Sequence, residues 1–131
     1  MKAIIFPGQG SQKAGMASEF QSNFKIVKDI LDRVDNALKF GLSKIILNGT
    51  DEDLKKTEIT QPAILTTSFA IFSVLKQEFN FDLSKVKYIA GHSLGEYSAL
   101  VASGSLSLEE AVTLVHERGK LMQDAVPEGK G

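Results

Sequence analysis

The feature that most constrains the fold is a short apolar segment followed at once by a Gly-x-Ser-x-Gly turn and a helical pattern. Residues 86–90 combine β-branched and aromatic side chains over a length too short for a helix, which predicts a strand. Residues 94–102 have the pattern of a helix. Between them lies Ser93, flanked by Gly91 and Gly95. The order strand, turn, helix is typical of a nucleophile elbow, a sharp turn that lifts a serine above a sheet.

The two glycines and the helix behind the serine give this turn a catalytic interpretation. A side chain at Gly91 or Gly95 would crowd the crossing of strand and helix. The free N–H groups at the start of the helix point to where an oxyanion would develop beside Ser93. The alternative is a serine in an ordinary glycine-rich turn, which an isolated Gly-x-Ser-x-Gly pattern also fits. The strand before the turn and the helix after it favour the catalytic interpretation.

Composition bounds the class of protein. The chain has 131 residues, of which 43% are hydrophobic and 24% charged, as is typical of one globular domain. The net charge of −1 gives no reason to expect nucleic-acid binding. The absence of cysteine excludes disulfides, thiolate metal sites and a cysteine nucleophile. The apolar start at residues 2–6 is too short for a signal peptide, and no apolar run approaches membrane-spanning length, so we expect a cytoplasmic protein without membrane or nucleic-acid partners.

The N-terminal segment predicts a second strand followed by a glycine-rich loop. Residues 2–6 have an unbroken apolar run, Ala-Ile-Ile-Phe, after Lys2, as in a strand that is buried on both faces of a parallel sheet. The loop at 7–15 does not match the dinucleotide fingerprint, because Lys13 stands where a third glycine is needed. The P-loop pattern fails as well, since residues 15–17 are Gly-Met-Ala. The glycines indicate a close backbone approach, which is compatible with an N–H donor that faces Ser93.

Helices are expected along most of the remaining chain. Residues 23–39 carry the apolar stripe of an amphipathic helix that Gly41 ends. Another helix begins at residues 60–62, with Pro62 in its first turn, and continues to Phe79. It is apolar nearly all round, which indicates that other structure encloses it. Together with the two strands, these helices predict an α/β fold with a mostly parallel sheet and a site at the carboxyl ends of the strands.

The last helix, which begins with a capping box at Ser107, contains an arginine on its apolar face. Arg118 lies three residues after Val115 and three before Leu121. A guanidinium in this position needs an anionic partner. The alternative, which helix geometry alone slightly favours, is an arginine at the edge of the stripe that extends its head to water. His116 is two residues away, about 200° round the helix, and cannot share a site with Arg118.

A serine nucleophile needs a base, usually a histidine, and neither histidine of the chain fits this role well. His92 is the neighbour of Ser93 in a tight turn and projects away from it, so a supporting role beneath the turn is the better interpretation. His116 lies on the wrong face of a later helix. In α/β-hydrolase order the base comes well after the serine. Either the chain is a fragment, or its serine is not catalytic as it stands.

Four motifs occur in order over nearly the whole chain: FPGQGSQ at 6–12, TQPA at 60–63, GHSLGEY at 91–97 and ERGKLM at 117–122. Together they resemble the malonyl-CoA:acyl carrier protein transacylase family and the similar acyltransferase domains of fatty-acid and polyketide synthases. The resemblance implies an α/β-hydrolase-like acyltransferase core of which residues 1–131 are the N-terminal portion. The catalytic histidine, its orienting residue and a ferredoxin-like subdomain are then expected after residue 131, and this chain alone would not complete turnover.

The resemblance also implies a reaction. A malonyl group would pass from malonyl-CoA to the phosphopantetheine thiol of acyl carrier protein, in fatty-acid biosynthesis, through a malonyl ester on Ser93. Gln9 and Leu94 match the positions whose backbone N–H groups form the oxyanion hole. No metal or cofactor is implied, since malonyl-CoA is a substrate. For the full-length protein we expect a monomer with acyl carrier protein as its partner.

The remaining matches concern substrate binding. Arg118 matches the arginine that pairs with the malonyl carboxylate, and a planar guanidinium suits this role better than lysine would. Gln61 matches a glutamine that lines the site, and His92 matches the histidine beside the nucleophile. The alternatives are a serine hydrolase with the same elbow, an acyltransferase domain of a polyketide synthase, and a non-catalytic fragment. A dinucleotide-binding module fits least, because the glycine-rich loop fails its pattern.

Overall fold

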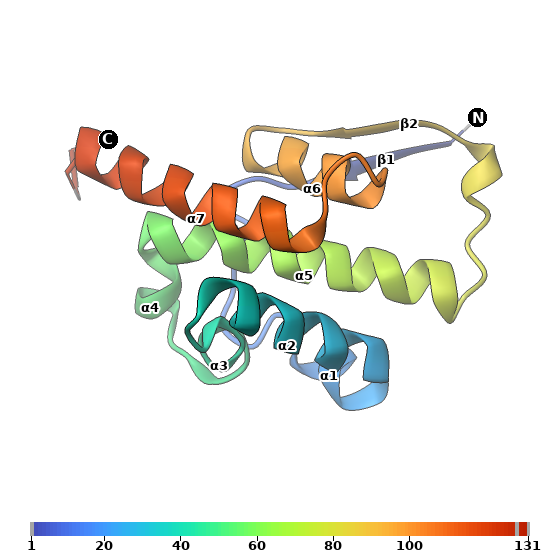
Figure 1. Ribbon diagram of the computed structural model, residues 1–131, viewed down its shortest axis with the longest axis horizontal. Helices are drawn as coiled ribbons and strands as arrows, with labels where there is room; N and C mark the ends of the chain where they lie inside the picture. The colour runs from blue at the N-terminus through green and yellow to red at the C-terminus, as the bar shows by residue number, and fades with distance from the viewer. Residues whose placement is uncertain (1, 128, 131) are drawn as a thin grey trace.

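The computed structural model describes residues 2–127, 129 and 130, and it has the α/β architecture expected from the sequence (Figure 1). Its two strands are parallel, and helices form the rest of the regular structure. In chain order the elements are β1 (Lys2–Phe6), α1 (Ser18–Asn23), α2 (Lys25–Leu38), α3 (Leu42–Asn48), α4 (Asp51–Lys55), α5 (Thr57–Gln77), the 3₁₀ turn η1 (Leu83–Lys85), β2 (Val86–Gly91), α6 (Leu94–Ala102) and α7 (Leu108–Ala125).

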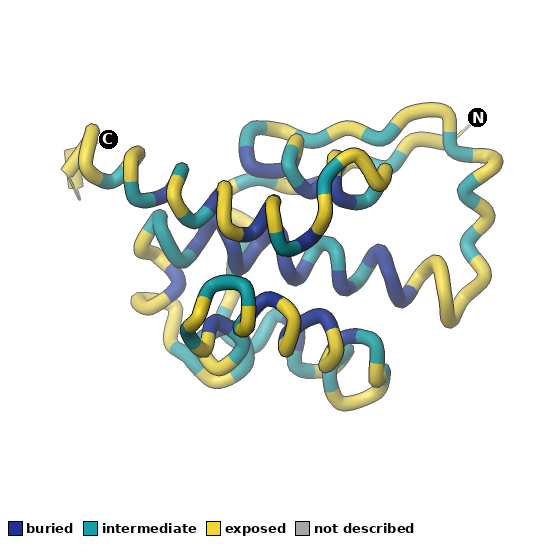
Figure 2. The backbone as a smooth tube through the Cα atoms, in the orientation of Figure 1, coloured by how far each residue is buried: buried dark blue, intermediate teal, exposed yellow. Residues whose placement is uncertain are grey.

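Helix α5 runs through the middle of the molecule because it is apolar on most of its surface. Its residues from Thr60 to Thr67 are buried without a break. Helices α7 and α6 pack on one side of it and α2 on the other (Figures 1 and 2). Contrary to the sequence-based expectation, α5 is long and apolar enough, by length and composition alone, to cross a membrane. Of its most apolar stretch 67% is buried inside the protein, as is usual for a core helix.

The start of α5 differs from the prediction. The helix begins at Thr57, so Pro62 lies in its interior and not in its first turn. The extra turn is held by Thr60, whose hydroxyl lies within hydrogen-bond distance of the carbonyl oxygens of Leu54 and Lys56 and shares its one proton between them. Because proline has no N–H, it cannot donate to the carbonyl four residues earlier, which belongs to Glu58. The helix therefore contains one interior carbonyl without its usual intrahelical partner.

The sheet pairs β1 with β2 in parallel, with Ile4 opposite Ile89. One face packs on α6 and on α5, where Phe6 meets the edge of the Phe72 ring. The prediction that residues 2–6 are buried on both faces is wrong, because Ile5 is 76% exposed. The described part of the chain places two strands in this sheet and no layer over the outer face (Figure 2).

The N-terminal helices also differ from the prediction in their ends. The helix expected over 23–39 begins at Lys25, because the extended backbone of Phe24 separates it from the unpredicted short helix α1. It ends at Leu38 and is capped by Lys39, which takes the left-handed conformation (φ 61°) usual for a glycine at this position. Gly41 instead precedes α3.

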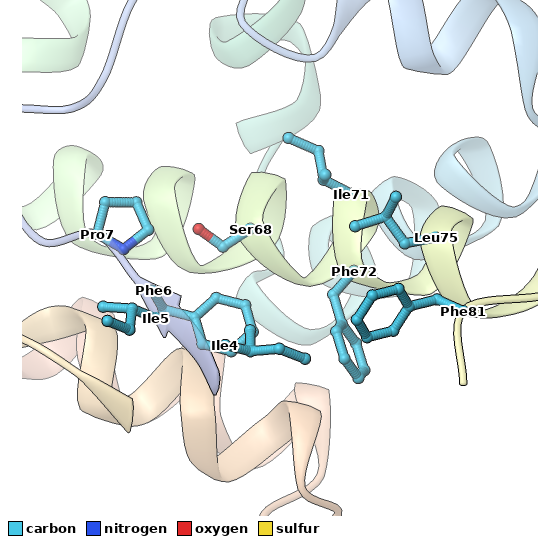
Figure 3. A pocket seen from close by; sticks show the side chains of 9 residues that line it. All are labelled: Ile4, Ile5, Phe6, Pro7, Ser68, Ile71, Phe72, Leu75 and Phe81. Atoms are coloured by element: carbon cyan, nitrogen blue, oxygen red, sulfur yellow. The ribbon is translucent and has the colours of Figure 1, made fainter. Parts of the chain in front are cut away.

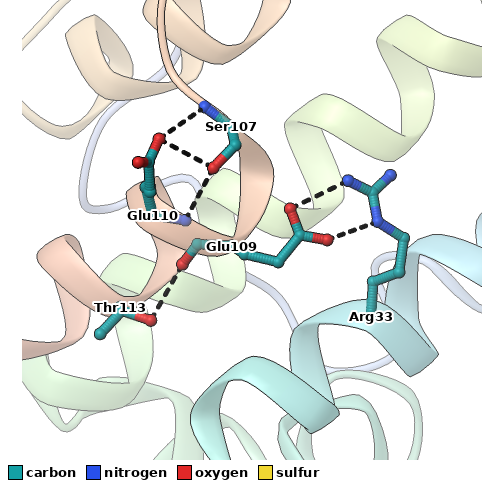
Figure 4. A network of polar contacts seen from close by, with 5 residues as sticks. All are labelled: Arg33, Ser107, Glu109, Glu110 and Thr113. Carbon is teal, nitrogen blue, oxygen red and sulfur yellow. Dashed lines mark hydrogen bonds and ion pairs between the residues drawn. The ribbon is translucent and has the colours of Figure 1, made fainter.

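The predicted capping box at Ser107 is confirmed, and an ion pair beside it joins α7 to α2 (Figure 4). The Ser107 hydroxyl accepts from the N–H of Glu110, whose carboxylate accepts from Ser107. Glu109, the residue before Glu110, receives hydrogen bonds from Arg33 on both carboxylate oxygens, at 2.7 and 3.1 Å. These bonds lower the pKa of Glu109 and raise that of Arg33. The pair fixes the start of α7 against α2.

Candidate active site

The turn between β2 and α6 has the geometry of a nucleophile elbow. Ser93 is the residue before α6 and has φ 53° and ψ −109°, a conformation that residues with a side chain rarely adopt. The turn is held by the N–H of Gly95, which donates to the His92 carbonyl at 2.9 Å. The His92 N–H in turn points to the carbonyl of Phe6 at 3.4 Å. The strained serine therefore sits at the carboxyl end of the sheet, as the sequence predicts.

Three glycines leave no room for a side chain around this turn. A Cβ atom at Gly91 would lie 2.0 Å from the backbone carbonyl of Gly95. A Cβ at Gly95 would lie 2.3 Å from the carbonyl oxygen of Phe6. At Gly8, in the loop after β1, it would lie 2.7 Å from the carbonyl oxygen of His92. The loop, the strand end and the start of α6 thus pack backbone against backbone, which confirms the predicted crowding.

Arg118 reaches Ser93 from the neighbouring helix α7. Its Nη2 donates to the Oγ of Ser93 at 3.1 Å, and its Nη1 donates to the Oε1 of Gln61 at 2.5 Å. The guanidinium also lies 5.5 Å from the ring centre of Tyr97, within the range of a cation–π contact. Both hydrogen-bond acceptors are neutral, and no carboxylate of the described residues forms an ion pair with Arg118. The half-buried charge is held beside the serine instead of extending to water, and it lacks a counter-charge in this part of the chain.

Gln61 connects the arginine to the glycine-rich loop. Its side chain is 1% exposed, and its Nε2 donates to the Oε1 of Gln9 at 3.3 Å and contacts Met122 Sδ at 3.5 Å. The predicted residues Ser93, Arg118, Gln61 and Gln9 therefore form one continuous network. Leu94 opens α6, so its N–H comes before the first intrahelical hydrogen bond. The oxyanion-hole role of the Gln9 and Leu94 N–H groups stays a prediction.

The two histidines lie apart from the serine hydroxyl. His92 is exposed, and its backbone takes part in the turn. His116 lies with its Nδ1 2.8 Å from the carbonyl oxygen of Glu58, and its ring packs at a tilt on Phe40. Among the described residues, the side chain that bonds to Ser93 Oγ is Arg118 and not a histidine. The described chain thus holds a candidate nucleophile without a candidate base, as the sequence indicates.

Sequence reasoning missed two residues of the site, Tyr97 and Met122. Tyr97 lies four residues after Ser93, one turn along α6, and this spacing is the signal that could have identified it. Met122 lies four residues after Arg118 on α7, but its place in an apolar stripe conceals its contact with Gln61.

Two cavities differ in their relation to this site. One, of about 470 Å³, borders Gln9, Thr57 and Met122, at the edge of the polar network. The other, of about 250 Å³, lies between β1 and the exposed side of α5 and contains none of the predicted site residues (Figure 3). Its lining is apolar apart from Ser68, so it offers packing surface and no catalytic groups. No cluster of three or more histidine and acidic side chains that could hold a metal occurs in residues 2–127, 129 and 130.

The fold and the site define an α/β protein with a serine elbow and an arginine beside the serine. The chain belongs to the acyl transferase domain family, whose family model matches residues 3–131. This confirms, at the level of the family, the resemblance inferred from the four motifs.

Named relatives and solved structures agree with this assignment. The chain is 47% identical over 129 residues to the malonyl CoA-acyl carrier protein transacylase of Haemophilus influenzae, and 45% identical to that of Bacillus subtilis strain 168. The malonyl CoA-acyl carrier protein transacylase of Coxiella burnetii superposes with a TM-score of 0.89 at 45% identity, covering 95% of this chain and 39% of that one. A malonyl-transacylase solved in complex with a type II PKS acyl-carrier protein superposes with a TM-score of 0.88 at 45% identity, covering 97% and 40%.

These matches cover the chain almost completely but the relatives only in part. The alignments span 98% of this chain and 41% of the Haemophilus influenzae protein, or 39% of the Bacillus subtilis protein. The chain therefore spans about two fifths of the length of the curated relatives that it matches.

Proposed function

We propose that this chain supplies the nucleophile and the carboxylate-binding side of an acyltransferase that moves a malonyl group from malonyl-CoA to the phosphopantetheine thiol of acyl carrier protein. The observation that carries the proposal is the pairing of Ser93 with Arg118, a serine on an elbow and an uncompensated cation within hydrogen-bond distance of it. Family membership and the names of the relatives support the acyl group and the carrier. The proposed location is the cytoplasm.

The first step forms the malonyl ester. Ser93 Oγ attacks the thioester carbonyl, and the resulting oxyanion accepts hydrogen bonds from the backbone N–H groups of Leu94 and Gln9. The carbon–sulfur bond then breaks, and the thiol of coenzyme A leaves with a proton. The proton of the serine hydroxyl passes to a base that residues 2–127, 129 and 130 do not place next to it. In this proposal the base comes from the part of the enzyme that corresponds to the rest of the relatives.

Arg118 selects the acyl group in this scheme. The free carboxylate of malonyl offers two oxygens to a planar guanidinium that now bonds to the neutral oxygens of Ser93 and Gln61. Exchange of a neutral acceptor for a charged one strengthens the hydrogen bonds and provides the missing counter-charge. The acyl carbonyl is then held next to Ser93. In the second step the phosphopantetheine thiol attacks the ester carbonyl, malonyl leaves on sulfur, and the proton returns to Ser93.

A serine hydrolase would use the same elbow but has no need for Arg118, because the substrate of a simple esterase has no free carboxylate that a guanidinium must hold. A non-catalytic fragment is the second candidate for the chain by itself, and the missing base beside Ser93 favours it. A type II PKS carrier is an alternative acceptor, because one structural neighbour was solved with such a protein.

The proposal is tested by incubation of the chain with malonyl-CoA, followed by intact mass spectrometry with Ser93→Ala as the control. The same experiment is run on a chimera in which the remaining sequence of the Haemophilus influenzae relative follows residue 131. We expect a malonyl adduct on the chimera that is lost in Ser93→Ala, and little or none on the chain alone. An adduct on neither protein would overturn the proposed function, and an adduct on both would show that the chain needs no further base.

A further inference from the structure

The starting point is the interior proline of α5. In an α-helix the N–H of residue 62 would donate to the carbonyl oxygen of Glu58, but Pro62 has no N–H. Buried or half-buried backbone carbonyls in proteins are almost always satisfied by some donor. The Glu58 carbonyl must therefore be satisfied from outside its own helical ladder.

His116 on α7 supplies that donor. Its Nδ1 lies 2.8 Å from the carbonyl oxygen of Glu58. Because a carbonyl oxygen can only accept, the ring must carry its proton on Nδ1 in this contact. The ring is kept in place on its other side by Phe40, whose centre is 5.3 Å away at an interplanar angle of 49°. The hydrogen bond joins α7 to α5 at the Glu58 carbonyl, which lacks its intrahelical N–H donor because residue 62 is proline.

Gly119 brings the backbones of the two helices together at the same place. A Cβ at Gly119 would lie 2.6 Å from the carbonyl oxygen of Thr57 and 2.7 Å from the Cα of Glu58. Gly119 and His116 are three residues apart on α7, so they share one face of the helix. Figure 1 shows α7 lying along the N-terminal half of α5, and the contacts of His116 and Gly119 are with the first turn of that helix. The contact leaves no space for α7 to slide without breaking the His116 bond.

Two residues of the candidate active site, Gln61 and Arg118, lie close in sequence to this contact between α5 and α7. Gln61 lies three residues after Glu58 on α5, and Arg118 lies between His116 and Gly119 on α7. Their side chains bond to each other, and the arginine then reaches Ser93. The relative position of the two helices at Glu58 thus sets where the guanidinium meets the serine.

We propose that His116 is a positioning residue, which holds α7 in register on α5 by donating to the carbonyl that Pro62 leaves unpaired and so places Arg118 for the malonyl carboxylate. The carboxylate role of Arg118 rests on the proposed function, whereas the register of the two helices does not. No reacting atom touches His116.

The chain offers a matched pair of variants for the test. His116→Asn keeps an N–H donor close to the position of Nδ1, and His116→Leu has nearly the same shape as asparagine but no donor. Each is made in the natural chain and in a Pro62→Ala background, where residue 62 regains an N–H for the Glu58 carbonyl. His116→Ala replaces the leucine variant if leucine prevents folding, which circular dichroism checks.

Two readouts are used. The first is the set of side-chain N–H signals of Arg118 and Gln61 in the isotope-labelled chain, together with the nitrogen signals of the His116 ring, measured by NMR. The second is the ratio of the affinity for malonyl-CoA to the affinity for acetyl-CoA. A general loss of structure would lower both affinities and leave their ratio unchanged. We expect a protonated Nδ1, unchanged Arg118 signals in His116→Asn, and displaced signals in His116→Leu. We expect His116→Leu to lower this ratio about five- to tenfold in the natural chain. In the Pro62→Ala background, the same substitution should lower the ratio less than about twofold relative to Pro62→Ala alone.

The outcomes separate the two proposals. Equal effects of asparagine and leucine, or an equal effect of leucine with and without Pro62, would overturn the positioning role. If the unaltered chain does not distinguish malonyl-CoA from acetyl-CoA, its substrate is wrongly assigned. The Arg118 and Gln61 signals still decide, in that case, whether His116 holds the register.

Discussion

Arg118 donates a hydrogen bond to the hydroxyl of Ser93, although the two residues come from different helices and are 25 positions apart in the sequence. The arginine has two neutral acceptors, Ser93 Oγ and Gln61 Oε1, and the ring of Tyr97 lies against its guanidinium. A cation in this state is ready to accept an anion without first breaking an ion pair. In the proposed function, this relationship links the nucleophile to the choice of acyl group.

Replacement of Arg118 by lysine should remove malonyl recognition while leaving the elbow intact. Lysine keeps the charge but loses the planar pair of donors that matches a carboxylate. Charge-assisted hydrogen bonds contribute about 1.5–3 kcal/mol, so we expect malonyl-CoA to bind about ten- to a hundredfold more weakly. Calorimetric titration with malonyl-CoA measures this effect. Acetyl-CoA is the control ligand, and a similar loss for both thioesters would contradict a carboxylate-specific role.

Replacement of Gly91 by alanine should destabilise the fold, because the new Cβ would lie 2.0 Å from the backbone of Gly95. Strand and helix must separate to relieve this overlap, and overpacking of this kind costs about 3 kcal/mol or more. The free energy of unfolding from urea denaturation measures the effect. Gly41→Ala is the matched control, since its nearest neighbour would be 3.9 Å away, and we expect a change within about 0.5 kcal/mol. Equal behaviour of the two variants would refute the close-packed crossing.

The site was more predictable from the sequence than the fold was. The elbow is formed by consecutive residues: a strand, the turn with Gly91, Ser93 and Gly95, and a helix. The hydrophobic periodicity and the glycines of the turn are therefore enough to recognise it from the sequence. The meeting of Arg118 with Ser93 depends on the packing of α7 on α5, and helix periodicity alone left two orientations of the arginine open. The four motifs resolved this choice before the structure did.

The errors came from tertiary contacts that no local pattern encodes. The interior position of Pro62 is tolerated because His116, more than fifty residues later, satisfies the freed carbonyl. The exposed outer face of β1 could not be predicted either, because a continuous apolar run indicates burial without saying what covers it. Lys39 caps α2 in a conformation usually taken by glycine, and because Gly41 is the expected stop, the predicted helix extends one residue beyond Leu38.

Replacement of Glu109 by glutamine should weaken the contact of α7 with α2 in a pH-dependent way (Figure 4). The hydrogen bonds from Arg33 lower the pKa of Glu109 in the folded state. A lowered pKa means that the ionised carboxylate stabilises the fold above the pKa of the unfolded chain, near 4.3, and that this contribution is lost as the pH falls through the folded-state value. Both side chains are about half exposed, 50% and 44%, so solvent screening limits the effect to about 0.5 kcal/mol at pH 7.

Urea denaturation of Glu109→Gln and of the unaltered chain at pH 7 and pH 3 measures this contribution. The difference between the two proteins should be present at pH 7, shrink at pH 3 and weaken in 1 M salt. Glu78→Gln removes an exposed carboxylate that forms no ion pair within the described residues, and it serves as the control. A difference that persists unchanged at pH 3 would show that packing and not charge is responsible.

Replacement of Gln61 by glutamate should weaken the binding of malonyl-CoA, because the new carboxylate would pair with Arg118. The Oε1 of Gln61 already accepts from Arg118 at 2.5 Å, so a carboxylate in this position would form a half-buried ion pair with the guanidinium. The charge that malonyl is proposed to neutralise would then be neutralised by the protein, and malonyl-CoA should bind at least about tenfold more weakly. Gln61→Met is the matched variant, because it removes the acceptor without adding charge and leaves Arg118 free for the ligand. Titration of both with malonyl-CoA distinguishes them. If glutamate and methionine weaken binding equally, the uncompensated charge of Arg118 is not what attracts the substrate.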